Sequence, residues 1–153
     1  MSTRLLLTAG SVLRGDDAAG PYLARMLEDN PIDGWTVIDG AQTPEDDIPV
    51  VRKIQPDLTV LVDAAAMGLA PGSIRLLKKE DVFTDYLMTT HSLPMTMLLE
   101  SLEQCSNKVL FIGIQAGQND LLAPLSPEVL QAVETLYQWL LDDVDLEQVI
   151  PTR

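Results

Sequence analysis

The sequence predicts an α/β fold: a three-layer sandwich in which a twisted, mainly parallel five-stranded sheet lies between helices. Short runs of Val, Ile and Leu alternate along the chain with stretches of helical periodicity, which is the pattern of repeated strand–helix units. The apolar runs are continuous rather than alternating, as is typical of parallel strands covered on both faces. With 153 residues, the chain has the length of one ordinary domain, and we expect residues 1–153 to form it.

Five segments are expected to be strands. Four are short, almost wholly apolar and rich in β-branched residues or leucine: residues 4–9, 35–39, 58–63 and 108–114. The fifth is expected at residues 73–77, because it follows the turn signal Ala70-Pro71-Gly72.

Helical periodicity fills the intervals, at residues 18–29, 45–54, 93–104 and 126–141. The last of these begins with Ser126 as the expected N-cap and Pro127 at the first helical position. After Leu141 the sequence becomes acidic, and we expect residues 142–153 to form a flexible tail.

The charge balance excludes two classes of partner. The chain has 23 acidic and 10 basic residues, for a net charge of −13, which repels phosphate backbones and anionic lipid headgroups. No apolar run approaches the roughly 20 residues of a membrane helix, and the N-terminus lacks the pattern of a signal peptide. The single cysteine, Cys105, cannot form an internal disulfide, which fits the reducing cytoplasm. We therefore expect a cytoplasmic protein that binds neither nucleic acid nor membrane, and a monomer.

Acidic residues recur where the predicted strands end, and ligands of open parallel sheets bind beyond those ends. Asp16 and Asp17 follow the first strand, Asp39 ends the second and Asp63 ends the third. The only histidine, His91, immediately precedes an apolar helix. Two carboxylates and an imidazole that converge there would suit a divalent ion such as nickel, zinc, cobalt or manganese.

Each candidate also has an ordinary structural role open to it. Asp16 or Asp17 is equally suited to capping the next helix. Asp39 and Asp63 are equally suited to forming turns, and a lone histidine such as His91 is more often a hydrogen-bonded structural residue. The glycine-rich loop is neither a P-loop nor a dinucleotide fingerprint, because it lacks the Lys-Ser or Lys-Thr pair and the required glycine spacing.

Several motifs, in order, resemble the hydrogenase maturation endopeptidases from about residue 5 to residue 140. The motifs are GSVLRGDDAAGP (10–21), VIDG (37–40), LVDA (61–64), TTHSLP (89–94) and FIGIQ (111–115). Residues 43–47 (TPEDD) and 67–72 (MGLAPG) resemble the branch of that family that processes the large subunit of hydrogenase 3.

The resemblance implies an endopeptidase that removes the C-terminal extension of a [NiFe]-hydrogenase large-subunit precursor once nickel is installed. The metal-contacting residues of the family map onto Asp17, Asp63 and His91, which are therefore the expected catalytic and metal-binding residues. Asp16 and Asp39 are possible helpers. The nickel is expected to arrive with the substrate, and no permanent cofactor is expected.

Two mechanisms and two rival functions remain open at this point. The nickel could polarise the scissile carbonyl and acidify a bound water, or it could only anchor the substrate while Asp16 or Asp39 acts as general base. One rival function is a non-catalytic chaperone that assembles the nickel site of the same subunit, since an acidic, carboxylate-lined surface would serve it equally well. The other is a broad metal-dependent hydrolase of small substrates.

Overall fold

The central sheet has the predicted class. The computed structural model describes residues 2–85 and 95–153, and within these ranges five strands form one sheet in the order β2-β1-β3-β5-β4. The strands are β1 (Arg4–Thr8), β2 (Trp35–Asp39), β3 (Leu58–Ala65), β4 (Ile74–Leu77) and β5 (Lys108–Gln115). The first three and β5 are mutually parallel, whereas β4 runs antiparallel to β5 at the edge. The prediction of a mainly parallel five-stranded sheet is confirmed.

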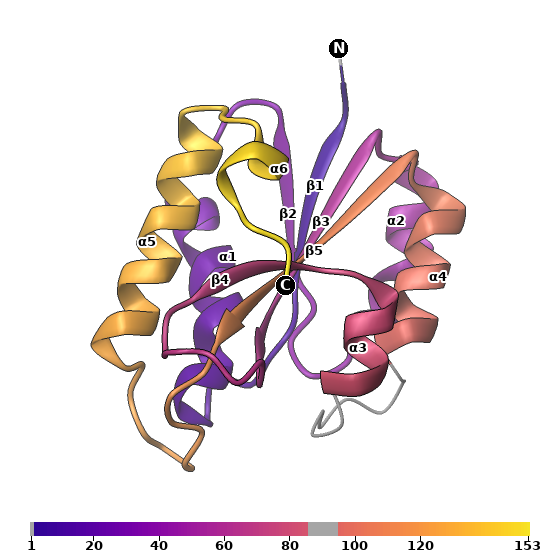
Figure 1. Ribbon diagram of the computed structural model, residues 1–153. Helices are drawn as coiled ribbons and strands as arrows, with labels where there is room; N and C mark the ends of the chain where they lie inside the picture. The colour runs from indigo at the N-terminus through magenta and orange to yellow at the C-terminus, as the bar shows by residue number, and fades with distance from the viewer. Residues whose placement is uncertain (1, 86–94) are drawn as a thin grey trace.

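Helices cover both faces of the sheet, which gives the predicted three layers (Figure 1). The helical segments are η1 (Gly15–Ala18), α1 (Ala19–Asp29), η2 (Pro44–Asp47), α2 (Ile48–Ile54), α3 (Lys79–Asp85), α4 (Met95–Cys105), α5 (Pro127–Leu141) and α6 (Leu146–Val149). Helices α1 and α5 pack together on one face, and α2 and α4 pack together on the other. No helix in the described ranges is long and apolar enough to cross a membrane.

The central strands are apolar at most positions because each face of the sheet has its own core. Leu6 and Val60 pack with α1 and α5, whereas their neighbours Leu5 and Leu61 pack with α2 and α4. Successive side chains of a strand point to opposite faces, so a strand buried on both sides must be continuously apolar. This is the physical basis of the sequence pattern that predicted the fold.

Two helical segments differ from the expectation. The helix expected at residues 45–54 is divided into the 3₁₀ turn η2 and the helix α2, because Pro49 is tolerated only in the first turn of a helix and so fixes a new start there. Helix α3 was not expected, since its short sequence is too polar to show a clear apolar stripe.

The acidic segment after Leu141 is packed, so the prediction of a flexible tail is wrong. Asp145 caps α6 by accepting a hydrogen bond from the backbone N–H of Glu147 at 3.1 Å. Beyond α6, the backbone N–H of Leu76 in β4 donates to the carbonyl of Pro151 at 2.9 Å, so the C-terminal segment lies along the edge strand (Figure 1). Leu146 and Ile150, which are four residues apart, are both buried. Among the surrounding acidic residues, this apolar pair was overlooked as a sign of packing.

Replacing Ile150 with Ala is expected to reduce the free energy of unfolding by about 2–4 kcal/mol, because its side chain, only 2% exposed, leaves a cavity in the core. The matched control is Val149→Ala, one residue earlier and 39% exposed, which is expected to cost less than about 1 kcal/mol. Urea denaturation of the two variants measures the difference. Equal effects would mean that the C-terminal segment is not anchored by Ile150.

Candidate functional site

The fold creates one topological switch point, between β1 and β3. After β1 the chain crosses to the face of α1, and after β2 it returns on the opposite face through α2 to reach β3. Neighbouring strands whose connections leave in opposite directions open a crevice at their carboxyl ends, where ligands of such sheets bind. The two strands are joined at this point by the N–H of Ala9, which donates to the carbonyl of Val62 at 3.0 Å.

Asp17 and Asp63 both lie at this edge of the sheet. Asp17 belongs to η1, which contacts β3, and Asp63 directly follows Val62 in β3. The Asp17 side chain is half-buried, and its Oδ2 accepts a hydrogen bond from the backbone N–H of Ser11 at 2.9 Å, which fixes its orientation. Asp63 is buried, and it shares its side of β3 with Leu61, the side on which α4 packs.

Glycine allows the close approach that brings these segments together. Gly10 has a φ of 136°, and a Cβ on it would lie 2.0 Å from the carbonyl oxygen of Asp17. At Gly20, a Cβ would lie 2.4 Å from the carbonyl oxygen of Ala9. Any larger residue at these positions would push η1 and α1 away from the strand ends, so the two glycines set the position of the Asp17 carboxylate.

His91 lies outside the described residues, between α3 and α4 in the sequence. Within residues 2–85 and 95–153, no group of three or more His, Cys, Asp or Glu side chains could hold a metal ion. The described part of the chain therefore places two members of the predicted ligand set, Asp17 and Asp63, at the same edge of the sheet, and their use as a three-ligand metal site with His91 remains a prediction.

Asp16 points inward, unlike its neighbour, and binds three backbone N–H groups. It accepts hydrogen bonds from Gly117 at 2.7 Å, Gln118 at 2.8 Å and Ser126 at 2.7 Å, and another from the Ser126 hydroxyl. Burial by itself raises the pKa of Asp16, but the hydrogen bonds from Ser126, Gln118 and Gly117 outweigh it, so the pKa is lowered. Asp16 thus ties the loop after β1 to the loop after β5 and to the start of α5.

This contact determines what two residues do. Ser126 is the N-cap residue of α5 as expected, but its side chain makes no capping bond because its hydroxyl donates to Asp16 instead. Asp16 is also a poor general base, because both carboxylate oxygens already accept hydrogen bonds and a lowered pKa weakens it as a proton acceptor.

Asp39 forms a turn at the end of β2. Its Oδ1 accepts the backbone N–H of Ala41 at 2.9 Å, and Ala41 has a φ of 51°, so the side chain stabilises a left-handed residue. The Asp39 side chain is exposed, and it lies at the same carboxyl edge as Asp17 because β1 and β2 are parallel neighbours.

Gln115 is a structural residue of this edge that the sequence reasoning missed. Its Oε1 accepts the backbone N–H of Met67 at 2.6 Å and that of Leu69 at 3.3 Å, and these bonds hold the loop after β3. The only sequence signal was a polar residue at the end of an apolar strand, in the motif FIGIQ. That position is where parallel-sheet proteins place side chains that organise a site.

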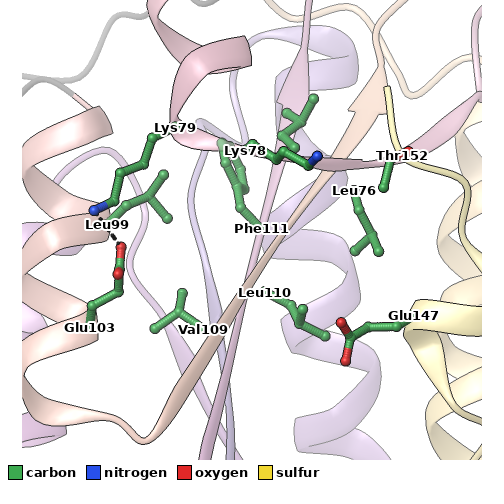
Figure 2. Close-up of a pocket in the computed structure, with 11 residues that line it drawn as sticks. Leu76, Lys78, Lys79, Leu99, Glu103, Val109, Leu110, Phe111, Glu147 and Thr152 are labelled. Carbon is green, nitrogen blue, oxygen red and sulfur yellow. Dashed lines mark ion pairs between the residues drawn. The ribbon is translucent and has the colours of Figure 1, made fainter.

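A hollow of about 290 Å³ lies elsewhere, between α4, β4 and α6 over the first half of β5 (Figure 2). Three of its charged lining residues are in ion pairs: Lys79 and Glu103 point toward one another with 2.8 Å between Nζ and Oε1, and Glu147 pairs with Lys108. Since β5 begins here and ends beside Asp63, this hollow is remote from the carboxyl edge and does not contribute to the candidate site.

Comparison with known proteins gives a consistent result. Residues 20–143 match the family model described as hydrogenase maturation protease. The chain is 40% identical over 138 residues to the hydrogenase 3 maturation protease of Escherichia coli strain K12, covering 90% of this chain and 88% of that protein.

Solved structures agree with the sequence comparison. A crystal structure of a hydrogenase 3 maturation protease superposes with a TM-score of 0.90 at 36% identity, covering 99% of this chain and 96% of that one. The solution structure of an Escherichia coli endopeptidase superposes with a TM-score of 0.88 at 37% identity, covering 98% and 96% of the two chains.

Proposed function

Because the chain belongs to the hydrogenase maturation protease family, and is therefore an endopeptidase, we propose that it removes the C-terminal extension of a [NiFe]-hydrogenase large-subunit precursor. We further propose that it cuts only precursor that already contains nickel. In this proposal the nickel is part of the substrate, and Asp17, Asp63 and His91 contact it.

The observation that carries the proposal is the placement of two carboxylates at one switch point. Asp17 and Asp63 come from separate segments of the chain and lie at the adjoining ends of β1 and β3, the first oriented by Ser11 and the second buried. A divalent cation in contact with both carboxylates would be attracted by each of them. A precursor without nickel lacks this attraction, so the two acids would distinguish loaded from empty substrate.

The chemistry follows from the same arrangement. Carboxylate and imidazole ligands suit nickel and leave coordination positions open for the substrate. A metal held there polarises a carbonyl oxygen and lowers the pKa of a bound water. If a free carboxylate instead activates the water, Asp39 is the remaining candidate helper, because Asp16 is already occupied by hydrogen bonds from Gly117, Gln118 and Ser126.

The rival function of a non-catalytic chaperone for the same subunit is not retained. The family model and the hydrogenase 3 maturation protease of Escherichia coli are both described as proteases. The first matches residues 20–143 and the second matches 90% of this chain. An acidic surface alone, which was the basis of the rival, is equally compatible with a protease that grips a nickel-containing client.

The deciding experiment incubates the purified protein with precursor prepared with and without nickel, and follows the mass of the precursor. We expect loss of the C-terminal extension in the nickel-loaded sample, at a rate about 100-fold or more above the nickel-free sample, because metal contacts supply several kcal/mol to the reacting complex. Equal cleavage of both samples would contradict recognition through nickel. Stoichiometric metal in the purified protein would contradict a metal that arrives only with the substrate.

A further inference from the structure

Large apolar side chains are exposed in two loops beside Asp17. Val12 is 69% exposed and Leu122 is 76% exposed, and Leu13 and Leu121 next to them are also exposed. Val12 and Leu13 belong to the loop after β1, whereas Leu121 and Leu122 belong to the loop after β5, which projects beyond the carboxyl edge of the sheet (Figure 1). We call these four residues the apolar rim.

Hydrogen bonds join the two loops into one preformed surface. The backbone N–H of Leu122 donates to the carbonyl of Leu13 at 2.6 Å, and the N–H of Asp16 donates to the carbonyl of Gln118 at 2.6 Å. The rim is also linked to the candidate site, since Val12 follows Ser11, whose N–H binds the Asp17 carboxylate. Whatever binds at Asp17 therefore lies beside the rim.

A groove of about 530 Å³ continues the rim along the molecule. Most of its lining residues are apolar or aromatic, among them Val12, Tyr22 and Leu125, and its charged lining residues are Arg25, Glu28 and Asp39. Tyr22 is itself exposed. The apolar surface thus extends from the β5–α5 loop over the start of α1 to the end of β2.

The conformation of Leu122 is a second sign that the rim serves binding. Leu122 has a φ of 64°, a left-handed conformation that costs a leucine free energy and that suits glycine or asparagine better. Its side chain is exposed, so it does not repay this cost by packing in the core. Stability of the free protein alone would favour a different residue here.

We propose that the apolar rim and its groove dock the folded body of the nickel-loaded precursor, on the surface that surrounds its nickel. This inference rests on the proposed function. A folded partner that presents nickel to Asp17 would lie next to Val12, because Val12 directly follows Ser11, whose N–H binds the Asp17 carboxylate. With a net charge of −13, electrostatic attraction alone would not select one face of the protein, whereas an apolar surface at the rim does.

The occupant is the folded body rather than the extension that is removed. The rim consists of side chains from two projecting loops held in fixed register, which suits a broad, shaped partner surface. An extended peptide is usually recognised through a row of main-chain hydrogen bonds at a sheet edge, whereas the four rim residues belong to loops and not to a strand.

The test is Leu122→Asn, assayed on nickel-loaded precursor. Asparagine tolerates the left-handed conformation, so the variant should fold as well as the parent while losing the apolar contact. We expect KM to rise about tenfold with kcat unchanged, and adding Val12→Ser should raise it further. The matched control is Leu141→Asn, at the far end of α5 and 49% exposed, which should leave KM unchanged.

A second arm identifies the occupant. Nickel-loaded precursor whose extension is replaced by a Gly-Ser segment of equal length is used as a competitor of normal cleavage. The proposal expects Leu122→Asn to weaken this competitor by the same factor as the natural precursor. A loss confined to the natural precursor would assign the rim to the extension and overturn the proposal.

The experiments distinguish a failure of the docking proposal from a failure of the proposed nickel-dependent cleavage. An unchanged KM in both rim variants overturns docking at the rim, while nickel-dependent cleavage by the parent would still support the proposed function. Cleavage that does not depend on nickel overturns that function itself, whatever the rim variants do.

Discussion

Replacing Asp17 with Ala is expected to abolish cleavage of nickel-loaded precursor, lowering kcat/KM by about 1000-fold or more. Asp17 is the proposed nickel contact whose carboxylate the structure orients, through the N–H of Ser11 at 2.9 Å. Removing a charged metal contact forfeits several kcal/mol in the reacting complex, and three orders of magnitude in rate correspond to about 4 kcal/mol. Rates are measured from the mass loss of the precursor.

Two further variants separate charge from loop geometry. In Asp17→Asn the amide oxygen can still accept the Ser11 N–H, but the negative charge is gone, so we expect the same loss of cleavage. Asp33→Ala removes an exposed carboxylate in the turn before β2, at the other end of the sheet, and should cleave at the parental rate. His91→Ala is expected to behave as Asp17→Ala does.

The fold should survive these changes, because the Asp17 side chain contributes one hydrogen bond to a half-buried site and its loss costs about 1–2 kcal/mol. Thermal unfolding checks that each variant is folded before its activity is interpreted. A folded Asp17→Ala variant that cleaves nickel-loaded precursor at the parental rate would remove Asp17 from the proposed contact set.

The fold was predictable because its signal is local. Strands such as Leu58–Ala65 are buried on both faces, and this burial appears directly as a continuous apolar run. The same local logic placed Asp63 near the carboxyl end of β3, although the strand continues to Ala65 and does not end at Asp63 as predicted. The same reasoning failed for the segment after Leu141. The acidic residues there led to the prediction of a flexible tail, although the buried side chains of Leu146 and Ile150 hold the segment on the core.

The inner organisation of the site was not predictable, because it depends on contacts between distant residues. Nothing in the adjacent pair Asp16 and Asp17 indicates which carboxylate points inward. The answer lies in backbone N–H groups at Gly117, Gln118 and Ser126, more than one hundred residues away along the chain. The apolar rim was not predictable either, since it forms where the loop that carries Leu122 is hydrogen-bonded to Leu13, a residue distant in the sequence.

Replacing Asp16 with Asn is expected to lower the free energy of unfolding at neutral pH by about 2–4 kcal/mol. All the groups that contact the buried carboxylate are hydrogen-bond donors. Hydrogen bonds to a charged group are worth about 1.5–3 kcal/mol each. An asparagine amide places its own NH₂ group against one of those N–H groups, which leaves both without an acceptor. Urea unfolding of the parent and the variant measures the loss.

The loss of free energy of unfolding in Asp16→Asn should depend on pH, and the pKa shift of Asp16 determines whether it grows or shrinks as the pH falls. That pKa is lowered in the folded protein: burial opposes ionisation, but the bonds from Ser126, Gln118 and Gly117 outweigh it. A carboxyl with a lowered folded pKa contributes stability that is fully present above its ordinary value of 3.8 and is lost as the pH falls through the folded value. The difference between parent and Asp16→Asn should therefore be constant near neutral pH and shrink below about pH 4.

A matched surface carboxylate separates this effect from a general loss of charge. Asp29 is exposed and pairs with Arg25 one helical turn away at 3.2 Å, so Asp29→Asn should cost less than about 1 kcal/mol. Ser126→Ala removes the hydroxyl bond to Asp16, and its cost should not add to that of Asp16→Asn, because both changes break the same contact. Additive costs, or a difference that persists unchanged at low pH, would show that the Asp16 carboxylate does not hold the β1 and β5 loops together.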